Sequence, residues 1–129
     1  MKISIIIPAY NEAKYLRACL ESIFSDTNSL LYEVIVVDNA STDDTASIVR
    51  SFSKVQLVRE SEKGVTKARA AGLSVANGDI IAYLDADTKM PRGWLSKIDY
   101  EFSKDPNLVA LSGPYSYYDV TPIQNFLVF

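Results

Sequence analysis

The chain has 129 residues, of which 48% are hydrophobic and 22% charged, and its formal net charge is −3. This length and composition are typical of one globular domain with its own core. Lys and Arg form no basic cluster, which argues against a nucleic acid as partner.

Short apolar runs alternate with segments of helical periodicity. In chain order they predict a strand over Lys2–Ile7, a helix over Glu12–Phe24, a strand over Glu33–Val37, a helix from Ser41 to about Phe52, a strand over Val55–Val58, a helix over Thr66–Ala76, a strand over Ile80–Leu84, a helix over Trp94–Ser103 and a strand over Leu108–Ser112. Ser41 is expected to be an N-cap, with Asp44 completing a capping box. The alternation predicts an α/β fold, a mainly parallel sheet with helices on both faces.

Three polar clusters directly follow predicted strands: Ala9–Glu12, Asp38–Asp44 and Asp85–Thr88. Ligands of such sheets bind beyond the carboxyl ends of the strands. We therefore expect these three stretches to converge on one rim of the sheet.

The third cluster begins Asp85-Ala86-Asp87. Two carboxylates that flank one small residue at a strand end can share a hard cation, which would bridge the phosphates of a nucleotide. The chain has no His, and its single cysteine, Cys19, lies in a helical run and is expected in the core, so any metal needs oxygen ligands, as Mg²⁺ or Mn²⁺ does. The alternative is a solvated acidic turn in which Asp87 caps a helix.

The first two clusters can serve a nucleoside. Asp38 can accept a hydrogen bond from the imide N–H of a pyrimidine, Tyr10 can stack on a base, and Glu12 can hold a ribose hydroxyl. The alternative for the first cluster is a simple turn with Asn11 as N-cap.

A fourth stretch, Lys63–Arg69, leads into the Ala-rich helix. Gly64 permits close approach of the backbone, and Lys67 or Arg69 could face phosphate. The alternative is an ordinary solvated basic helix face.

Taken in order, these stretches resemble family 2 glycosyltransferases of the GT-A fold, which is Rossmann-like. The matching segments are Ile5–Glu12, Val36–Thr45, Gly64–Gly72, Gly78-Asp79 and Leu84–Asp87. The resemblance implies the following roles: Pro8, Ala9, Tyr10 and Glu12 line the nucleoside pocket, Asp38 contacts the base, Gly64, Lys67 and Arg69 approach the nucleotide, Asp85 reaches the ribose or the metal with Ala86 beside it, and Asp87 ligates the metal.

The resemblance also implies a reaction. A sugar would pass, with inversion, from a UDP- or GDP-linked donor to an acceptor such as a lipid-linked sugar or a polysaccharide. The family's general base lies in a later segment, is expected beyond Phe129, and is assigned to no residue here. Residues 1–129 are thus expected to form the nucleotide-sugar-binding domain, truncated before the acceptor-binding half and without full activity.

Two expectations concern the wider protein. The apolar end, Phe126–Phe129, is expected to drive self-association or to begin a membrane-associated helix in a longer chain. The N-terminal apolar run is too short for a signal peptide, which favours a cytoplasmic protein, at the inner face of the membrane in its full-length form.

Three other classes remain as alternatives. A non-catalytic nucleotide-binding module would bind the same ligands without turnover. A phosphotransferase similar to the haloacid dehalogenases would need Asp-x-Asp-x-Thr, but Lys89 occupies the fifth position. A receiver domain would need an acidic pair after the first strand, where this chain has Pro8-Ala9-Tyr10-Asn11.

Overall fold

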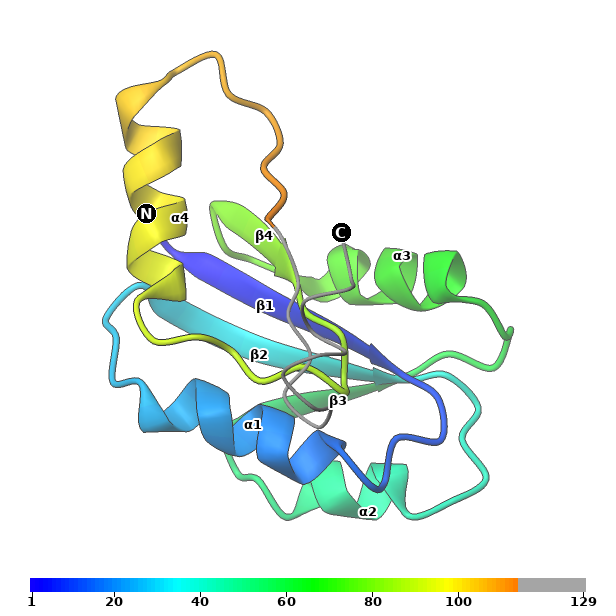
Figure 1. The fold of residues 1–129 in the computed structure, drawn as a ribbon. Coiled ribbons are helices and arrows are strands. Elements are labelled where there is room, and N and C mark those ends of the chain that lie inside the picture. Colours follow the sequence, from blue (N-terminus) through cyan, green and yellow to red (C-terminus); the bar gives the residue numbers. More distant parts are fainter. Residues whose placement is uncertain (114–129) are drawn as a thin grey trace, which may run out of the picture.

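Strands and helices alternate strictly through residues 1–113, the part of the chain that the structure, a computed structural model, describes (Figure 1). In chain order the elements are β1 (Ile3–Ala9), α1 (Leu16–Ser25), β2 (Leu31–Asp38), α2 (Thr45–Arg50), β3 (Val55–Arg59), α3 (Val65–Val75), β4 (Ile80–Tyr83) and α4 (Trp94–Lys104). Every predicted helix and the first four predicted strands are present.

The four strands form one parallel sheet in the order β3-β2-β1-β4. β1 is central and pairs with β2 on one side and with β4 on the other, and nearly all of its residues are buried. A strand that is covered on both faces must be apolar throughout, which explains the unbroken run Ile5-Ile6-Ile7. The predicted α/β class with a parallel sheet is confirmed.

Helices cover both faces of this sheet. Ile5 and Ile7 pack in one cluster with buried residues of α1 and α4, such as Leu20 and Leu95. Ile6 points to the other face and packs with Ala68 of α3. Figure 1 shows α1 and α2 on one side of the sheet and α3 on the opposite side. Each fully buried aliphatic side chain contributes about 1.5–3 kcal/mol, so this core dominates the stability of the fold.

Polar side chains organise the rim at the amino ends of the strands. The hydroxyl of Ser4 donates to Glu33 Oε1 at 2.7 Å and accepts from the N–H of Gly78 at 2.8 Å. Glu33 Oε1 also accepts from the N–H of Asn77 at 2.6 Å. These bonds fix the turn that leads into β4, on the side of the sheet away from the three polar clusters.

Two predicted helix starts are wrong. α2 begins at Thr45, after Asp44, and no side chain caps it, so Ser41 and Asp44 form no capping box. α1 begins at Leu16, four residues after the predicted Glu12. In both cases the polar residues before the helix are used in bonds between loops, described below.

The predicted fifth strand, Leu108–Ser112, is also wrong. Those residues are irregular, and Val109 is 92% exposed. An apolar run becomes a strand only where a neighbouring strand accepts its backbone hydrogen bonds, and within residues 1–113 none pairs with this segment. The apolar end, Phe126–Phe129, lies outside the described residues. In residues 1–113 no helix is long and apolar enough to cross a bilayer.

Candidate functional site

The loop after β1 is tied to the loop after β2 by three successive backbone N–H groups. Each of the three donates to a side chain of the β2–α2 loop or of the first residue of α2: Asn11 to Ser41 Oγ at 3.0 Å, Glu12 to Thr45 Oγ1 at 3.0 Å and Ala13 to Asp43 Oδ2 at 3.2 Å. Two of the predicted polar clusters are therefore joined into one unit at the rim, as expected from their position after adjacent parallel strands.

Asn11 completes this unit from the opposite direction. Its backbone has a positive φ of 51°, and its Oδ1 accepts from the N–H of Thr42 at 2.8 Å. Asn tolerates this left-handed conformation better than most residues do. Asn11 therefore does not act as the N-cap of α1 but closes the junction between the two loops.

Asp43 is stabilised as a carboxylate within the same junction. The hydroxyl of Thr45 donates to it, and the backbone N–H groups of Thr45 and Ala13 add further bonds. These hydrogen bonds, that of the Thr45 side chain first, lower the pKa of Asp43. Sequence reasoning missed this role, because the signal is a set of donors and acceptors facing each other across two loops.

Asp38, the predicted base contact, ends β2 beneath this junction. Its side chain is only 2% exposed, and its Oδ1 accepts from the N–H of Ser41 at 3.1 Å. Its Oδ2 lies 3.8 Å from Nη1 of Arg59, a largely exposed side chain. The structure thus places Asp38 at the rim, with its carboxylate held by its neighbours.

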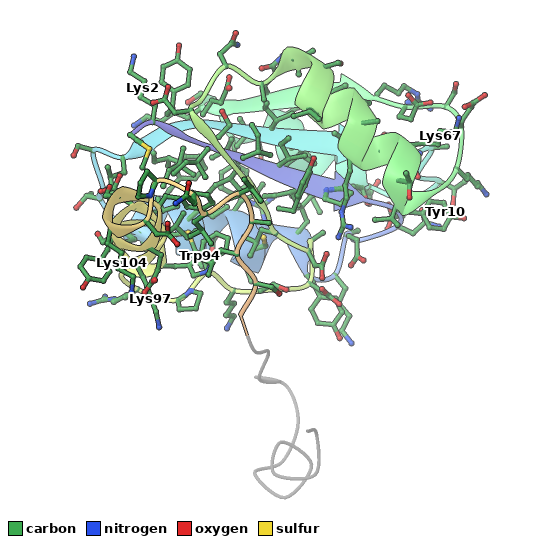
Figure 2. All side chains as sticks on the ribbon, turned by 90° about the horizontal axis from the view of Figure 1, so that it is seen from above. Lys2, Tyr10, Lys67, Trp94, Lys97 and Lys104 are labelled. Atoms are coloured by element: carbon green, nitrogen blue, oxygen red, sulfur yellow. The ribbon has the colours of Figure 1, made fainter. Side chains whose placement is uncertain are left out.

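Tyr10 stands at the same rim and is partly exposed. Nζ of Lys63 donates to its hydroxyl at 3.2 Å and lies 4.9 Å from its ring centroid, close enough for a cation–π contact. Figure 2 shows Tyr10 and Lys67 at one end of the molecule, with Lys2 and Lys104 at the other. Lys63 was not singled out from the sequence, although it directly precedes Gly64.

The two cations of α3 have different partners. Lys67 Nζ lies 3.0 Å from Glu62 Oε2, so it is paired with the segment that leads into α3. Arg69 Nη2 lies 3.9 Å from Asp85 Oδ1, and the guanidinium lies 5.3 Å from the Tyr83 ring centroid. Its Nε is buried and has no hydrogen-bond partner in the described residues. Arg69 therefore lies beside the predicted acidic pair, whereas Lys67 is paired elsewhere.

The acidic pair follows β4 as predicted. Ala86 is buried at 2% exposure in the larger core cluster, while the side chain of Asp85 is 46% exposed and Asp87 is also exposed. The buried methyl group thus turns both carboxylates outward. Asp87 does not cap a helix, because the next helix, α4, begins after Gly93.

Carboxylates accumulate where these loops meet. Burial raises the pKa of Glu12, and the charges of Asp87, Asp43 and Asp85 raise it further. Burial, followed by the charges of Asp87, Asp85 and Glu12, likewise raises the pKa of Cys19 to about 12. The buried thiol is therefore protonated at neutral pH, in keeping with its predicted place in the core.

This concentration of negative charge fits a bound cation. Within residues 1–113 no three His, Cys, Asp or Glu side chains are grouped to hold an ion by themselves. Asp85 and Asp87 offer a partial set of hard oxygen ligands, which suits a cation that takes its other ligands from phosphate and water. That is the usual coordination of Mg²⁺ at nucleotides.

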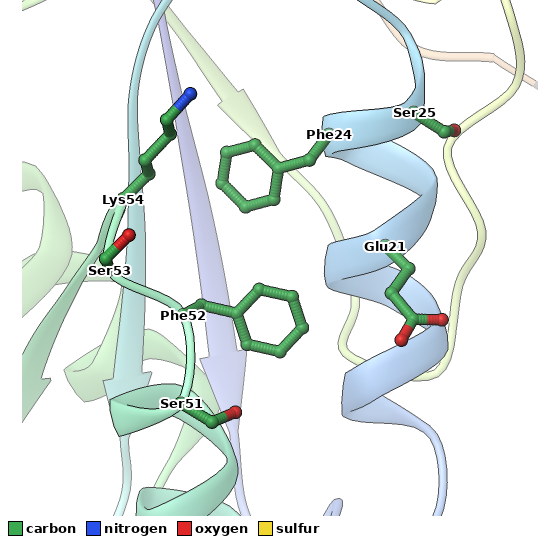
Figure 3. Close-up of a pocket in the computed structure, with 7 residues that line it drawn as sticks. All are labelled: Glu21, Phe24, Ser25, Ser51, Phe52, Ser53 and Lys54. Atoms are coloured by element: carbon green, nitrogen blue, oxygen red, sulfur yellow. The ribbon is translucent and has the colours of Figure 1, made fainter.

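A shallow hollow of about 480 Å³ lies elsewhere on the molecule (Figure 3). It is bordered by the end of α1 and the segment between α2 and β3, and Phe24 and Phe52 stack there with ring centroids 6.2 Å apart. None of its lining residues belongs to the rim described above.

The sequence of nearly the whole chain is similar to those of known glycosyltransferases. The family model for glycosyl transferase family 2 matches residues 4–126. Glycosyltransferase AglE of Haloferax volcanii is 39% identical over 101 residues, which are 74% of this chain and 33% of that protein. The dolichol-phosphate mannosyltransferase of Pyrococcus furiosus is 34% identical over 89% of this chain and 34% of its own length.

Solved structures agree. The structure of the mannosyltransferase PcManGT of Pyrobaculum calidifontis, in complex with GDP-Man and Mn²⁺, has a TM-score of 0.76 and 34% sequence identity to this chain. The match covers 83% of this chain and 33% of the PcManGT chain. The structure of S. aureus TarS 1–349 in complex with UDP has a TM-score of 0.75 and 25% sequence identity to this chain. The match covers 93% of this chain and 40% of the TarS chain. This chain spans about a third of the length of the curated relatives named above. With a family match over nearly its whole length and a GT-A-like parallel sheet, the chain belongs to glycosyl transferase family 2.

Proposed function

We propose that residues 1–129 form the nucleotide-sugar-binding domain of an inverting, divalent-metal-dependent glycosyltransferase. The observation that carries this proposal is the meeting of the Asp85–Asp87 pair, Glu12 and Arg69 at one rim of the sheet. Four stretches that are distant in sequence contribute to this rim, and their residue types suit the parts of one ligand.

The nucleoside would lie against the joined loops after β1 and β2. Tyr10 has an exposed ring that would stack on the base, and Pro8 and Ala9, at the end of β1, would line the pocket beside it. Glu12 has a carboxylate for the ribose hydroxyls. Asp38 Oδ2 lies 3.8 Å from Nη1 of Arg59, whose side chain is largely exposed, and a rotation of that side chain into solvent would free Oδ2 for the base.

The diphosphate would lie between the acidic pair and α3. Asp85 and Asp87 would hold a Mg²⁺ or Mn²⁺ ion, which supplies Lewis-acid stabilisation of the departing diphosphate. Arg69, with its unpartnered Nε, and the Gly64 segment at the start of α3 would bind phosphate oxygens from the other side. With such an ion bound, the nucleoside diphosphate would be a better leaving group.

The solved relatives support the choice of donor. Their complexes contain UDP, UDP-GlcNAc, or GDP-Man with Mn²⁺. We propose a UDP- or GDP-linked sugar as donor for this protein as well. We propose inversion from the family resemblance, and we assign the general base to no residue of this chain.

Isothermal titration calorimetry with UDP, GDP and CDP, each with Mn²⁺ and with EDTA, tests this proposal. We expect binding of UDP or GDP that strengthens when Mn²⁺ is present. If none of the three binds in a metal-dependent way, the proposal is wrong. Slow hydrolysis of the corresponding nucleotide sugar would further separate a transferase from the alternative, a module that only binds nucleotide.

A further inference from the structure

We propose that Asn39 is a positioning residue that holds the segment between β3 and α3, residues 60–64, over the nucleoside pocket. The inference rests on the proposed function, because it names the residue that sets the geometry of that pocket. Asn39 itself is only 4% exposed and has no open path to a ligand.

The side-chain amide of Asn39 is fully occupied by the backbone of that segment. Its Nδ2 donates to the carbonyl of Glu60 at 3.0 Å and to that of Glu62 at 2.7 Å. Its Oδ1 accepts from the N–H of Gly64 at 2.9 Å. An amide alone supplies two donors and an acceptor in this arrangement, since a carboxylate cannot donate and an aliphatic residue can do neither.

The backbone of Asn39 extends the connection to β1. Its N–H donates to the carbonyl of Ala9 at 2.8 Å, directly before Tyr10. Asn39 therefore bonds on one side to the strand end that leads into the nucleoside pocket and on the other side to residues 60–64.

The segment held in this way carries the groups that would meet the nucleotide. Lys63 bonds to the Tyr10 hydroxyl. Gly64 has a φ of 138°, which other residues rarely adopt, and its carbonyl accepts from the N–H of Ala68 in the first turn of α3. The start of α3 in turn sets the position of Arg69. Loss of the Asn39 amide should thus misplace Lys63 and the amino end of α3 while it removes no atom that contacts the ligand.

The test compares Asn39→Ala with a matched control, Ser4→Ala. Ser4 is also buried and also bonds to the backbone of a distant turn, but at the opposite rim of the sheet. Both variants should unfold at lower temperature than the wild type, because each leaves buried polar groups without a partner. Affinity for UDP or GDP with Mn²⁺ is measured by calorimetry, and hydrogen exchange of residues 60–64 by mass spectrometry.

We expect Asn39→Ala to weaken nucleotide binding by about tenfold and to speed exchange in residues 60–64. Ser4→Ala should change the affinity by less than about twofold, because it lies outside the site. If Asn39→Ala does not fold, Asn39→Asp makes the same comparison, since it keeps the acceptor for Gly64 and loses both donors.

Two results would overturn the inference, and they differ from a failure of the proposed function. One is an Asn39 variant that binds nucleotide as tightly as the wild type does. The other is a loss of affinity that Ser4→Ala reproduces in full, which would mean that lower stability alone is the cause. A wild type that binds no nucleotide would instead overturn the proposed function itself.

Discussion

Ala86 lies between Asp85 and Asp87, and its burial determines which way their side chains face. Its methyl group is packed in the core, so the carboxylates on either side face solvent. The position of this pair directly after a strand could be predicted from the sequence, because an acidic-small-acidic triplet after an apolar run is a local pattern. The sequence did not predict the bonds of Ser41 and Asp43, because their partners, Asn11 and Ala13, lie about thirty residues away. The same side chains could satisfy a helix end or another loop, and local sequence does not decide between them.

Glu12 gives the carboxylate cluster a measurable pH dependence. Its pKa is raised in the native state above the ordinary value of 4.5, so the native state binds this proton more tightly than the unfolded state does. Above its raised pKa the ionised Glu12 therefore costs stability, and below pH 4.5 the cost is absent because both states are protonated. With EDTA present, Glu12→Gln should raise the thermal midpoint at pH 7, and the gain should vanish as the pH falls below 4.5.

The control for this prediction is Glu21→Gln, which removes the same charge from an exposed position of α1. Thermal unfolding followed by circular dichroism between pH 4 and pH 8 makes the comparison. A Glu12→Gln variant that is no more stable than Glu21→Gln at pH 7 would contradict the claim that ionised Glu12 destabilises the fold.

At the level of elements, the parallel strands were predicted well because burial on both faces leaves a continuous apolar run. The same rule failed for Leu108–Ser112, where the run is apolar but has no neighbouring strand in the part of the chain that the structure describes. α1 was predicted to start too early: the N–H groups of Glu12 and Ala13 bond to Thr45 and Asp43, and only the carbonyl of Glu12 joins the helix, by accepting from the N–H of Leu16. Helix type and order follow from periodicity, whereas helix starts depend on partners from other elements.

The packing of α3 on the sheet depends on Gly72. A Cβ there would lie 2.5 Å from Ile6 Cγ2 and 3.1 Å from Val37 Cγ2, both in a buried cluster. Gly72→Ala should therefore lower the free energy of unfolding by up to about 2 kcal/mol, because overpacking costs about 1–3 kcal/mol and the gain in helix propensity offsets only about 1 kcal/mol of it. Urea unfolding measures the difference.

Ser74→Ala provides the control, because Ser74 is an exposed residue of the same helix. It should be as stable as the wild type or slightly more stable. If Gly72→Ala gains stability as Ser74→Ala does, then α3 does not approach the sheet as closely as described.

On the scale of the whole molecule, the site exists because parallel strands end at the same rim. The joined loops after β1 and β2, the start of α3 and the residues after β4 meet there, although they span residues 8–87 of the chain. The order and spacing of the motifs were enough to predict this meeting. The arrangement covers the donor side of the proposed reaction, in a chain that spans about a third of its curated relatives.

The most direct test of the central claim is the affinity of UDP and GDP for the wild type and for Asp87→Ala, each with Mn²⁺ and with EDTA. Asp79→Ala, which removes an exposed carboxylate near the opposite rim, is the control. We predict that Mn²⁺ strengthens binding at least about tenfold in the wild type and in Asp79→Ala, as expected for an ion shared by protein and diphosphate. Asp87→Ala should bind equally weakly with and without Mn²⁺. An Asp87→Ala protein that keeps the full effect of Mn²⁺ would contradict the account.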